Sequence, residues 1–171
     1  MKKLLSAIAI ITLIATTSKG YAQTENAIAF NFRKAVALSN SGTAKISRTH
    51  VSLSALKDFE KSFKKVSDEK WFKVPGGVIA NFLSKGVDFR ITYDEQGKWL
   101  CNLLTYPENR LPSDVRDLVK TRYYDYEIQY CNEYQFAHSS IYVIKMQDDT
   151  SVKTVRVADG EMEVIADKKR S

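Results

Sequence analysis

The 171-residue sequence is poor in the side chains that build catalytic and metal sites, since it contains two histidines and two cysteines. The cysteines, Cys101 and Cys131, do not form the Cys-x-x-Cys pair of thioredoxin-like redox proteins. Zinc sites need histidines and cysteines clustered at short spacing. The four candidates in this sequence, at positions 50, 101, 131 and 138, are not clustered in this way. We therefore expect no metal site and no redox centre.

Sequence motifs of the common enzyme classes are absent as well. No serine lies in a Gly-x-Ser-x-Gly elbow, and neither a phosphate-binding glycine loop nor a dinucleotide fingerprint is present. The polar turns are too short for a twelve-residue calcium loop, and the 20 acidic residues allow no carboxylate pair to be assigned. The sequence predicts a protein without enzymatic activity and without a cofactor. A pocket joining His138 with acidic residues or with Cys131 is the one version of an enzyme that stays open.

The sequence also lacks a strong excess of basic charge once its first residues are set aside. The formal net charge is +6, from 26 basic and 20 acidic residues. Residues 1–22 hold three lysines and no acid, so their removal leaves 23 basic residues and a net charge of +3. Proteins that bind nucleic acid gather basic residues on one face, and this small, dispersed excess does not predict such binding.

Residues 1–22 have the pattern of a secretory signal peptide. Lys2 and Lys3 precede an apolar run, and Gly20 and Ala22 fit the −3 and −1 positions of a cleavage site before Gln23. A membrane anchor is the alternative, but the uncharged run is shorter than the ~20 residues that a span needs. No cysteine follows the run, which excludes a lipobox. We expect a periplasmic or secreted protein without a membrane span after cleavage.

The rest of the chain divides by its hydrophobic period. Residues 23–50 show no sustained period and are predicted to be a loosely tied N-terminal arm. Residues 51–107 begin with apolar residues spaced three and four apart, which is typical of an amphipathic helix, and continue with a period of two, which is typical of strands. Residues 108–167 repeat this plan. The apolar face of the first predicted helix comprises Leu53, Leu56, Phe59, Phe63 and Val66. That of the second comprises Leu111, Val115, Leu118 and Val119.

These periods predict an α+β fold made of two tandem units, each a helix followed by a four-stranded antiparallel sheet, with the helices packed on one face of the sheet or sheets. The two units make one domain of the mature chain or two subdomains that share a core. The hairpin over residues 91–106 closes the first unit, and its Asp-Glu-Gln-Gly segment is turn chemistry.

The strand over residues 123–136 is unusually rich in tyrosine. Strict alternation places Tyr124, Tyr126, Ile128, Tyr130, Tyr134 and Phe136 on one face. The opposite face would carry Asp125, Glu127, Gln129, Cys131, Glu133 and Gln135. The tyrosines would form either a binding surface, because tyrosine gives a large contact area at low entropic cost, or a core face beneath the helices. The candidate partner or ligand surface therefore comprises Tyr126, Tyr130, Tyr134, Glu127, Gln129 and Glu133.

Cys101 and Cys131 are a candidate disulfide, because two cysteines of an exported chain enter an oxidising compartment. The bond would close a loop of about 30 residues and contribute roughly 3 to 4 kcal/mol in the chain-entropy model. Two separate thiols on different strands are the equally weighted alternative.

Four segments carry a resemblance to a known family, and they read ALKDFEKSFKKVSDEKWFKV, FRITYDEQGKWL, LPSDVRDLVKTRYYDYEI and VRVADGEMEVI. Over residues 51–167 the chain resembles exported PepSY-like proteins with the fold of the β-lactamase-inhibitor protein, the BLIP-like fold. The resemblance implies the fold alone, and the founding inhibitor of that fold binds its enzyme across the concave face of its sheet. No contact residue of the inhibitor is matched, so inhibition of a β-lactamase is not implied.

The function that follows is an exported, non-enzymatic binding or inhibitor-like module that presents an open sheet face to a protein or peptide partner. The alternative is a binder of a small ligand or an envelope polymer that uses the tyrosine-rich strand 123–136. The two functions differ in which face of the sheet is left uncovered. An uncovered polar face would favour the protein or peptide partner, and an uncovered aromatic face would favour the small ligand or polymer.

Overall fold

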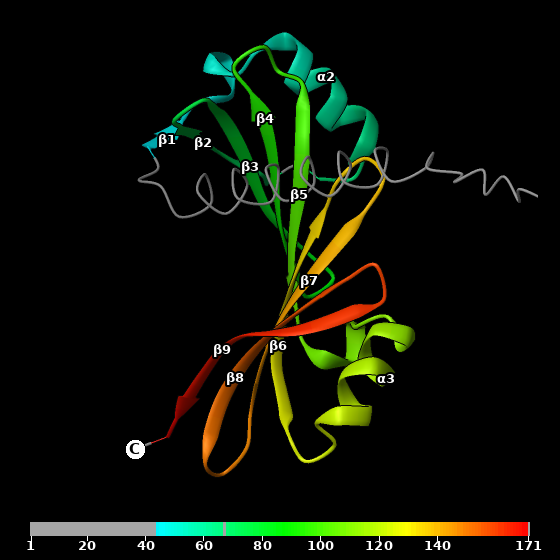
Figure 1. The fold of residues 1–171 in the computed structure, drawn as a ribbon. Coiled ribbons are helices and arrows are strands. Elements are labelled where there is room, and N and C mark those ends of the chain that lie inside the picture. The colour runs from blue at the N-terminus through cyan, green and yellow to red at the C-terminus, as the bar shows by residue number, and fades with distance from the viewer. Residues whose placement is uncertain (1–43, 67, 171) are drawn as a thin grey trace, which may run out of the picture.

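The computed structural model describes residues 44–66 and 68–170. Nine strands form one antiparallel sheet, and their order across the sheet is their order along the chain (Figure 1). The strands are β1 (Ala44–Ile46), β2 (Lys70–Val74), β3 (Gly77–Ser84), β4 (Val87–Asp94), β5 (Trp99–Tyr106), β6 (Glu127–Gln135), β7 (Ser140–Gln147), β8 (Ser151–Ala158) and β9 (Glu161–Lys169). The helices are α2 (Leu53–Ser62) and α3 (Ser113–Arg122), each preceded by a short 3-10 helix, η1 (Arg48–His50) and η2 (Glu108–Arg110).

Helix α2 begins at a serine cap and buries an aromatic face. The Ser52 hydroxyl accepts a hydrogen bond from the Ala55 amide at 3.3 Å, which satisfies one of the free amides of the first turn. The Phe59 ring lies 5.4 Å from the Trp71 ring and 5.7 Å from the Phe82 ring, in edge-on contacts. The periodicity predicted this face except for its first residue, because Leu53 is exposed and Ala55 is fully buried in its place.

The turn between β4 and β5 lies directly against the start of α2. Gly97 has a φ of +78°, and a Cβ atom there would lie 2.1 Å from the Ser52 hydroxyl oxygen and 2.9 Å from the Ala55 amide. Only glycine combines this backbone conformation with so close an approach. The turn predicted at Asp-Glu-Gln-Gly is confirmed, and it supports the helix cap.

Helix α3 packs on the second half of the sheet. Its buried Val115 and Val119 contact a core cluster of strand residues that includes Ile128, Ile144 and Val155. The apolar face predicted for this helix is confirmed, since its four members all lie in or against this cluster.

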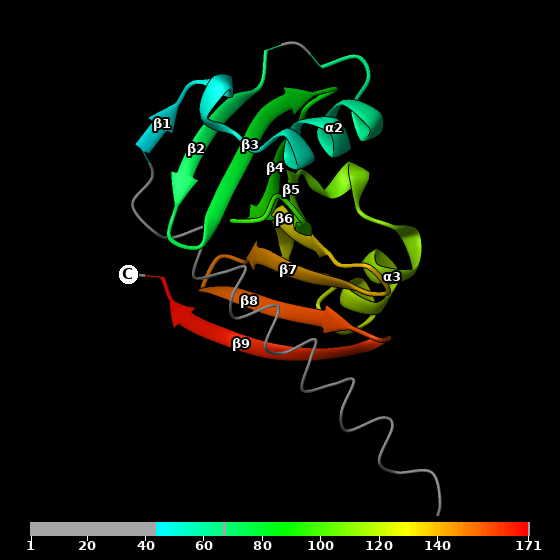
Figure 2. The same cartoon turned by 90° about the horizontal axis from the view of Figure 1, so that it is seen from above.

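Both helices lie on the same side of the sheet, one over each half (Figures 1 and 2). We call this side the helix face. The other side, which carries Cys101, Leu103 and Ile141, is called the open face, and no helix within residues 44–66 and 68–170 contributes to its clusters. The α+β class with helices on one face is confirmed. The eight strands that follow the helices belong to one continuous sheet, and the tandem-repeat relation between the two units stays a prediction.

The described part of the predicted N-terminal arm belongs to the sheet. β1 pairs with β2, with Ile46 opposite Trp71, and Ile46 packs against the first core cluster. Residues 44–50 are therefore not a loose arm, because an apolar side chain anchors them. The predicted signal peptide and the rest of the arm lie outside the described residues.

The last strand extends two residues beyond the second predicted unit, which ends at residue 167. The residues from Asp167 to Lys169, which have the composition of a polar tail, continue β9 and pair with the start of β8. Within the ranges described, no helix has the length and apolar character needed to cross a membrane.

Candidate functional site: the open face of the sheet

The open face carries an unbroken row of side chains that crosses seven strands. The row comprises Leu83, Asp88, Thr105, Asn132, Val143, Arg156 and Glu163, each directly opposite the next. Neighbouring strands are separated by roughly 4.8 Å, so the row spans about 29 Å. Because it runs from β3 to β9, the row joins the two halves of the molecule into one surface.

Charged groups of both signs lie along this surface. Arg156 forms an ion pair with Glu163 at 2.7 Å, and Arg90 lies 4.0 Å from Asp88. The Lys145 ammonium lies 5.8 Å from the centre of the Tyr130 ring, in cation–π geometry. These side chains are partly exposed, so the surface offers charged, aromatic and hydrogen-bonding groups to a partner.

An apolar floor lies among these polar groups. Cys101, Leu103, Tyr134 and Ile141 are all buried and pack on one another, with Phe136, Val143 and Ala158 against them. The Thr105 hydroxyl donates to the Asn132 side chain at 2.8 Å beside this floor. Outside this floor, Leu83 reaches solvent with 68 % of its surface exposed, and Tyr130 is 38 % exposed on the same face.

A bulge in β6 divides the tyrosine stripe between the two faces. The register with β7 shifts between Ile128, opposite Met146, and Tyr130, opposite Lys145, which leaves Gln129 as an extra residue. Strict alternation therefore fails, and the prediction of a single aromatic face is wrong. Tyr126 is buried on the helix face, whereas Tyr130 and Tyr134 lie on the open face.

The three polar residues predicted to accompany the tyrosines are also separated. Glu127 and Gln129 are exposed at the start of β6 and at its bulge. Glu133 is buried on the helix face, where it accepts a hydrogen bond from the Tyr106 hydroxyl at 2.6 Å. Of the predicted surface residues, Tyr130 is the one that is both on the open face and more than one-third exposed.

Buried Glu133 belongs to a polar network that links the two halves on the helix face. The Trp99 indole donates to Asn102 at 2.8 Å, and Asn102 donates to Gln135 at 3.2 Å. Gln135 in turn donates to Glu133 at 2.8 Å. The network connects β5 with β6, and its role is to satisfy buried polar groups at the junction of the two cores. Alternation alone assigned Glu133 to the same side as Gln129, so no sequence signal separated the two.

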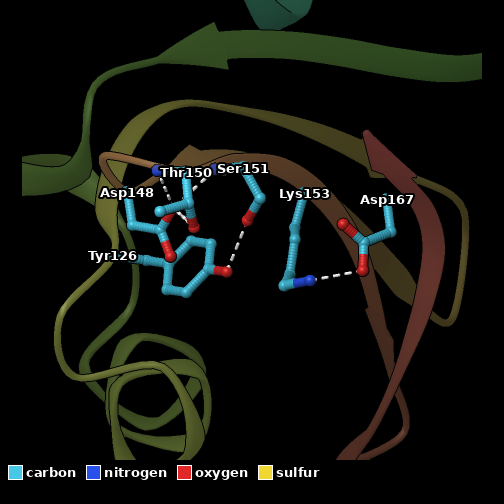
Figure 3. A network of polar contacts seen from close by, with 6 residues as sticks. All are labelled: Tyr126, Asp148, Thr150, Ser151, Lys153 and Asp167. Atoms are coloured by element: carbon cyan, nitrogen blue, oxygen red, sulfur yellow. Dashed lines mark hydrogen bonds and ion pairs between the residues drawn. The ribbon is translucent and has the colours of Figure 1, made fainter. Parts of the chain in front are cut away.

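Figure 3 shows a second polar cluster, at the turn between β7 and β8. The Tyr126 and Ser151 hydroxyls are 2.6 Å apart, and the Lys153 ammonium lies 5.7 Å from the centre of the Tyr126 ring. The Asp148 carboxylate accepts from the Thr150 amide at 2.7 Å and from the Ser151 amide at 2.6 Å. Serine, tyrosine and lysine side chains also occur close together in the reaction centres of some hydrolases and dehydrogenases.

The protonation of this cluster argues against such chemistry. The hydrogen bond from Lys153 to Asp167 raises the pKa of the Lys153 ammonium, which therefore stays protonated and cannot accept a proton at neutral pH. Desolvation alone would raise the pKa of Asp148, but hydrogen bonds from the Thr150 amide, the Tyr126 hydroxyl and the Ser151 amide outweigh it and lower that pKa. Tyr126 and Ser151 are both buried. The cluster fastens the end of β9 to the turn before β8.

A cavity of about 500 Å³ adjoins the same turn. It is lined by Asp125, Glu127, Gln147, Asp148, Asp149, Thr150 and Arg170. Arg170 is the basic residue of this lining, and its guanidinium donates to the main-chain carbonyl of Asp148 at 2.7 Å. In the part of the chain that the structure describes, no three His, Cys, Asp or Glu side chains are grouped as a metal ion would require.

The two cysteines are separate thiols, each buried in a different cluster. Cys101 lies on the open face opposite Thr92, and Cys131 lies on the helix face opposite Tyr106. The candidate disulfide is therefore not formed, because the sheet itself lies between the two side chains. Burial raises the pKa of Cys101 from 9.0 to about 11 and that of Cys131 to about 12.

Neither thiol should react with Ellman's reagent in the folded protein. A rise in pKa from 9.0 to about 11 lowers the thiolate fraction of Cys101 at neutral pH about a hundredfold, and burial also blocks the reagent. We expect no release of thionitrobenzoate at pH 8, and two equivalents after the addition of guanidinium. A Ser54→Cys variant, whose added thiol is exposed, should give one equivalent before denaturation. Zero equivalents in denaturant would instead reveal a disulfide.

The histidines lie at exposed positions in different parts of the fold. His50 belongs to η1, and His138 lies in the turn between β6 and β7. Cys131 is four residues from the end of β6, which places it about 13 Å along the strand from that turn. The structure therefore does not bring His138 together with Cys131.

Comparison with solved structures identifies the fold. A DUF2874 family protein from Bacteroides ovatus matches with a TM-score of 0.57 and 18 % identity, over 70 % of this chain and 87 % of that one. A BLIP-like protein from Bacteroides fragilis matches with a TM-score of 0.56 and 15 % identity, over 70 % and 86 %. A protein of Bacteroides eggerthii described as "putative periplasmic" matches with a TM-score of 0.56 and 16 % identity, over 70 % and 89 %.

No protein-family model and no curated protein matches the sequence. The chain therefore has a BLIP-like α+β fold, and at these identities the likeness extends to the fold alone.

Proposed function

We propose that the protein is a non-enzymatic binding module of the periplasm or the secreted fraction, and that it binds a protein or peptide partner through the open face of its sheet. The BLIP-like fold supports this proposal, as does the "putative periplasmic" description of a structure with the same fold. The proposed PepSY-like relationship rests on the sequence segments quoted above.

The observation that carries the proposal is the row of side chains on the open face, which is exposed at Leu83 and Glu163 and partly exposed between them. In the described residues both helices pack on the other face, so the row from Leu83 to Glu163 is left without a helical cover. The open face combines the exposed Leu83, the Arg156–Glu163 ion pair and the Tyr130–Lys145 pair. Protein-binding surfaces typically combine an apolar anchor, aromatic and arginine side chains, and a polar rim.

The chemistry of the buried reactive groups is consistent with a protein that binds and does not catalyse. The raised pKa values of both cysteines leave them protonated at neutral pH, so neither supplies a thiolate nucleophile. Lys153 is held protonated by Asp167. The tyrosine-strand alternative loses its physical basis, because the bulge in β6 leaves no continuous aromatic face.

Leucines with matched exposure allow a direct test. Leu83 on the open face is 68 % exposed, and Leu53 on α2 is 66 % exposed. We expect Leu83→Asp combined with Lys145→Glu to weaken capture of the partner from an envelope extract of the organism that makes the protein by about tenfold or more. The same chemical changes at Leu53 and Lys65, on the helix side, should leave capture unchanged.

Circular dichroism of the unmodified protein and the two double variants should show that all three are folded. Equal loss of capture in both double variants would show that the open face is not the binding surface. No partner above background with the unmodified protein would contradict the binding function itself.

A further inference from the structure

β9 is a long edge strand whose sequence has a distinct polarity. It is nine residues long and forms the outer edge of the sheet in the described residues, whereas the opposite edge, β1, has three residues. The acidic residues Glu161 and Glu163 lie in its first half, Lys168 and Lys169 lie at its end, and Asp167 between them is paired with Lys153 of β8. Between them, Val164 and Ile165 are 42 % and 48 % exposed.

A bulge places the opposite charges on the same face. The register with β8 shifts so that Val164 lies opposite Val155 and Ala166 opposite Thr154, which makes Ile165 an extra residue. Glu163 pairs with Arg156, and Lys168 pairs with Val152, and both of these β8 residues face the open side. In a regular strand, residues five apart point to opposite faces. The bulge therefore brings Glu163 and Lys168 onto the open face together.

We propose that β9 is a self-association edge, at which two copies of the chain pair antiparallel about a two-fold axis near Ile165. Antiparallel pairing places the first half of one β9 beside the last half of the other, so that Glu163 of each copy faces Lys168 of the other. Parallel pairing would place like charges beside each other, which is unfavourable. A two-fold axis makes both contacts identical, as an isologous dimer requires.

The apolar centre of the strand and its free backbone groups supply the remaining contacts. An edge strand presents unpaired N–H and C=O groups that a second strand can satisfy. The exposed Val164 and Ile165 lie beside the axis, where the second copy would bury them. The bulge also lies at this centre, so the charged halves on each side of it remain regular. The open-face row, which ends at Glu163, would continue into the second copy.

The test is the oligomeric state of the mature chain and of two charge-reversal variants, measured by sedimentation between about 1 µM and about 1 mM. We expect a monomer–dimer equilibrium for the unmodified chain. The Glu161→Lys, Glu163→Lys variant and the Lys168→Glu, Lys169→Glu variant should each dimerise at least about tenfold more weakly, because their copies meet with like charges. An equimolar mixture of the two variants should form a heterodimer again.

The mixture separates the proposed interface from a damaged fold, because complementary charges restore pairing and misfolding does not. Control reversals of equal charge, at Lys64 and Lys65 and at Asp117 and Asp125, should leave the dimer intact. A chain that stays monomeric at the highest concentration would overturn the proposal. So would a dimer that neither β9 variant weakens, or a mixture that associates no better than its components. Since the proposed partner binding is tested separately through Leu83, its failure would leave this result unaffected.

Discussion

Replacing Phe59 with alanine is expected to destabilise the fold by about 3 to 5 kcal/mol. The Phe59 side chain is 1 % exposed, and its ring contacts the rings of Phe63, Trp71 and Phe82 at 5.2 to 5.7 Å. The substitution removes the apolar contact area and leaves a cavity that the rigid sheet below cannot close. Equilibrium unfolding in urea, with the free energy extrapolated to water, measures the loss.

Leu53→Ala on the same helix is the matched control. Leu53 is 66 % exposed, so its truncation should change the free energy of unfolding by no more than about 0.5 kcal/mol. Similar losses in the two variants would mean that α2 does not pack through the Phe59 face.

Replacing Tyr106 with phenylalanine is expected to cost about 1.5 to 3 kcal/mol of stability, although it removes one oxygen atom. The Tyr106 hydroxyl donates to the Glu133 carboxylate at 2.6 Å, and both residues are buried. Without this donor, one Glu133 carboxylate oxygen loses its hydrogen bond from Tyr106 in a buried place. Burial first, and then the hydrogen bond to Glu133, raise the pKa of Tyr106, so the phenol is the donor at every pH at which the protein is stable.

A double-mutant cycle with Glu133→Gln isolates this interaction. The amide oxygen can still accept from Tyr106, but without a full charge, so Tyr106→Phe should cost about 1 kcal/mol less in the Glu133→Gln background. Thr121→Val, which removes an exposed 2.7 Å bond from the Thr121 hydroxyl to the Asp117 carbonyl, should cost no more than about 0.5 kcal/mol. Additive losses at Tyr106 and Glu133 would show that the two residues are not coupled.

The hydrophobic period predicted the buried faces of the helices correctly where the backbone is regular. The spacing of Phe59 and Phe63 predicted the buried face of α2, and Val115 and Val119 predicted that of α3. The period of two after each helical segment predicted strands there, and β2 to β5 follow α2 while β6 to β9 follow α3. Leu53 is the exception on α2, since it is 66 % exposed and Ala55 is buried instead.

The composition of the candidate surface could not be derived in the same way. Gln129 and Ile165 are extra residues in β6 and β9, and neither is a glycine or another residue type that marks a bulge. Each extra residue reverses the face of the sheet toward which the later residues of its strand point. Strict alternation therefore predicts Tyr126 and Tyr130 on one face and Glu133 on the surface, and the structure differs on both. The separation of Cys101 from Cys131 depends on strand pairing as well, because spacing along the chain does not report the face on which a thiol lies.

The order of the strands has a consequence for how the chain folds. Each strand pairs with its neighbours in sequence, and six of the eight pairings close a short turn that costs little chain entropy, whereas β1–β2 and β5–β6 are joined through a helix. The first core is built from residues 46 to 99 alone, whereas the second core also needs Val87 and Phe89 from β4. A chain that emerges amino end first can therefore complete its first core before β6 exists, and that finished half then provides the template on which the remaining strands add one at a time.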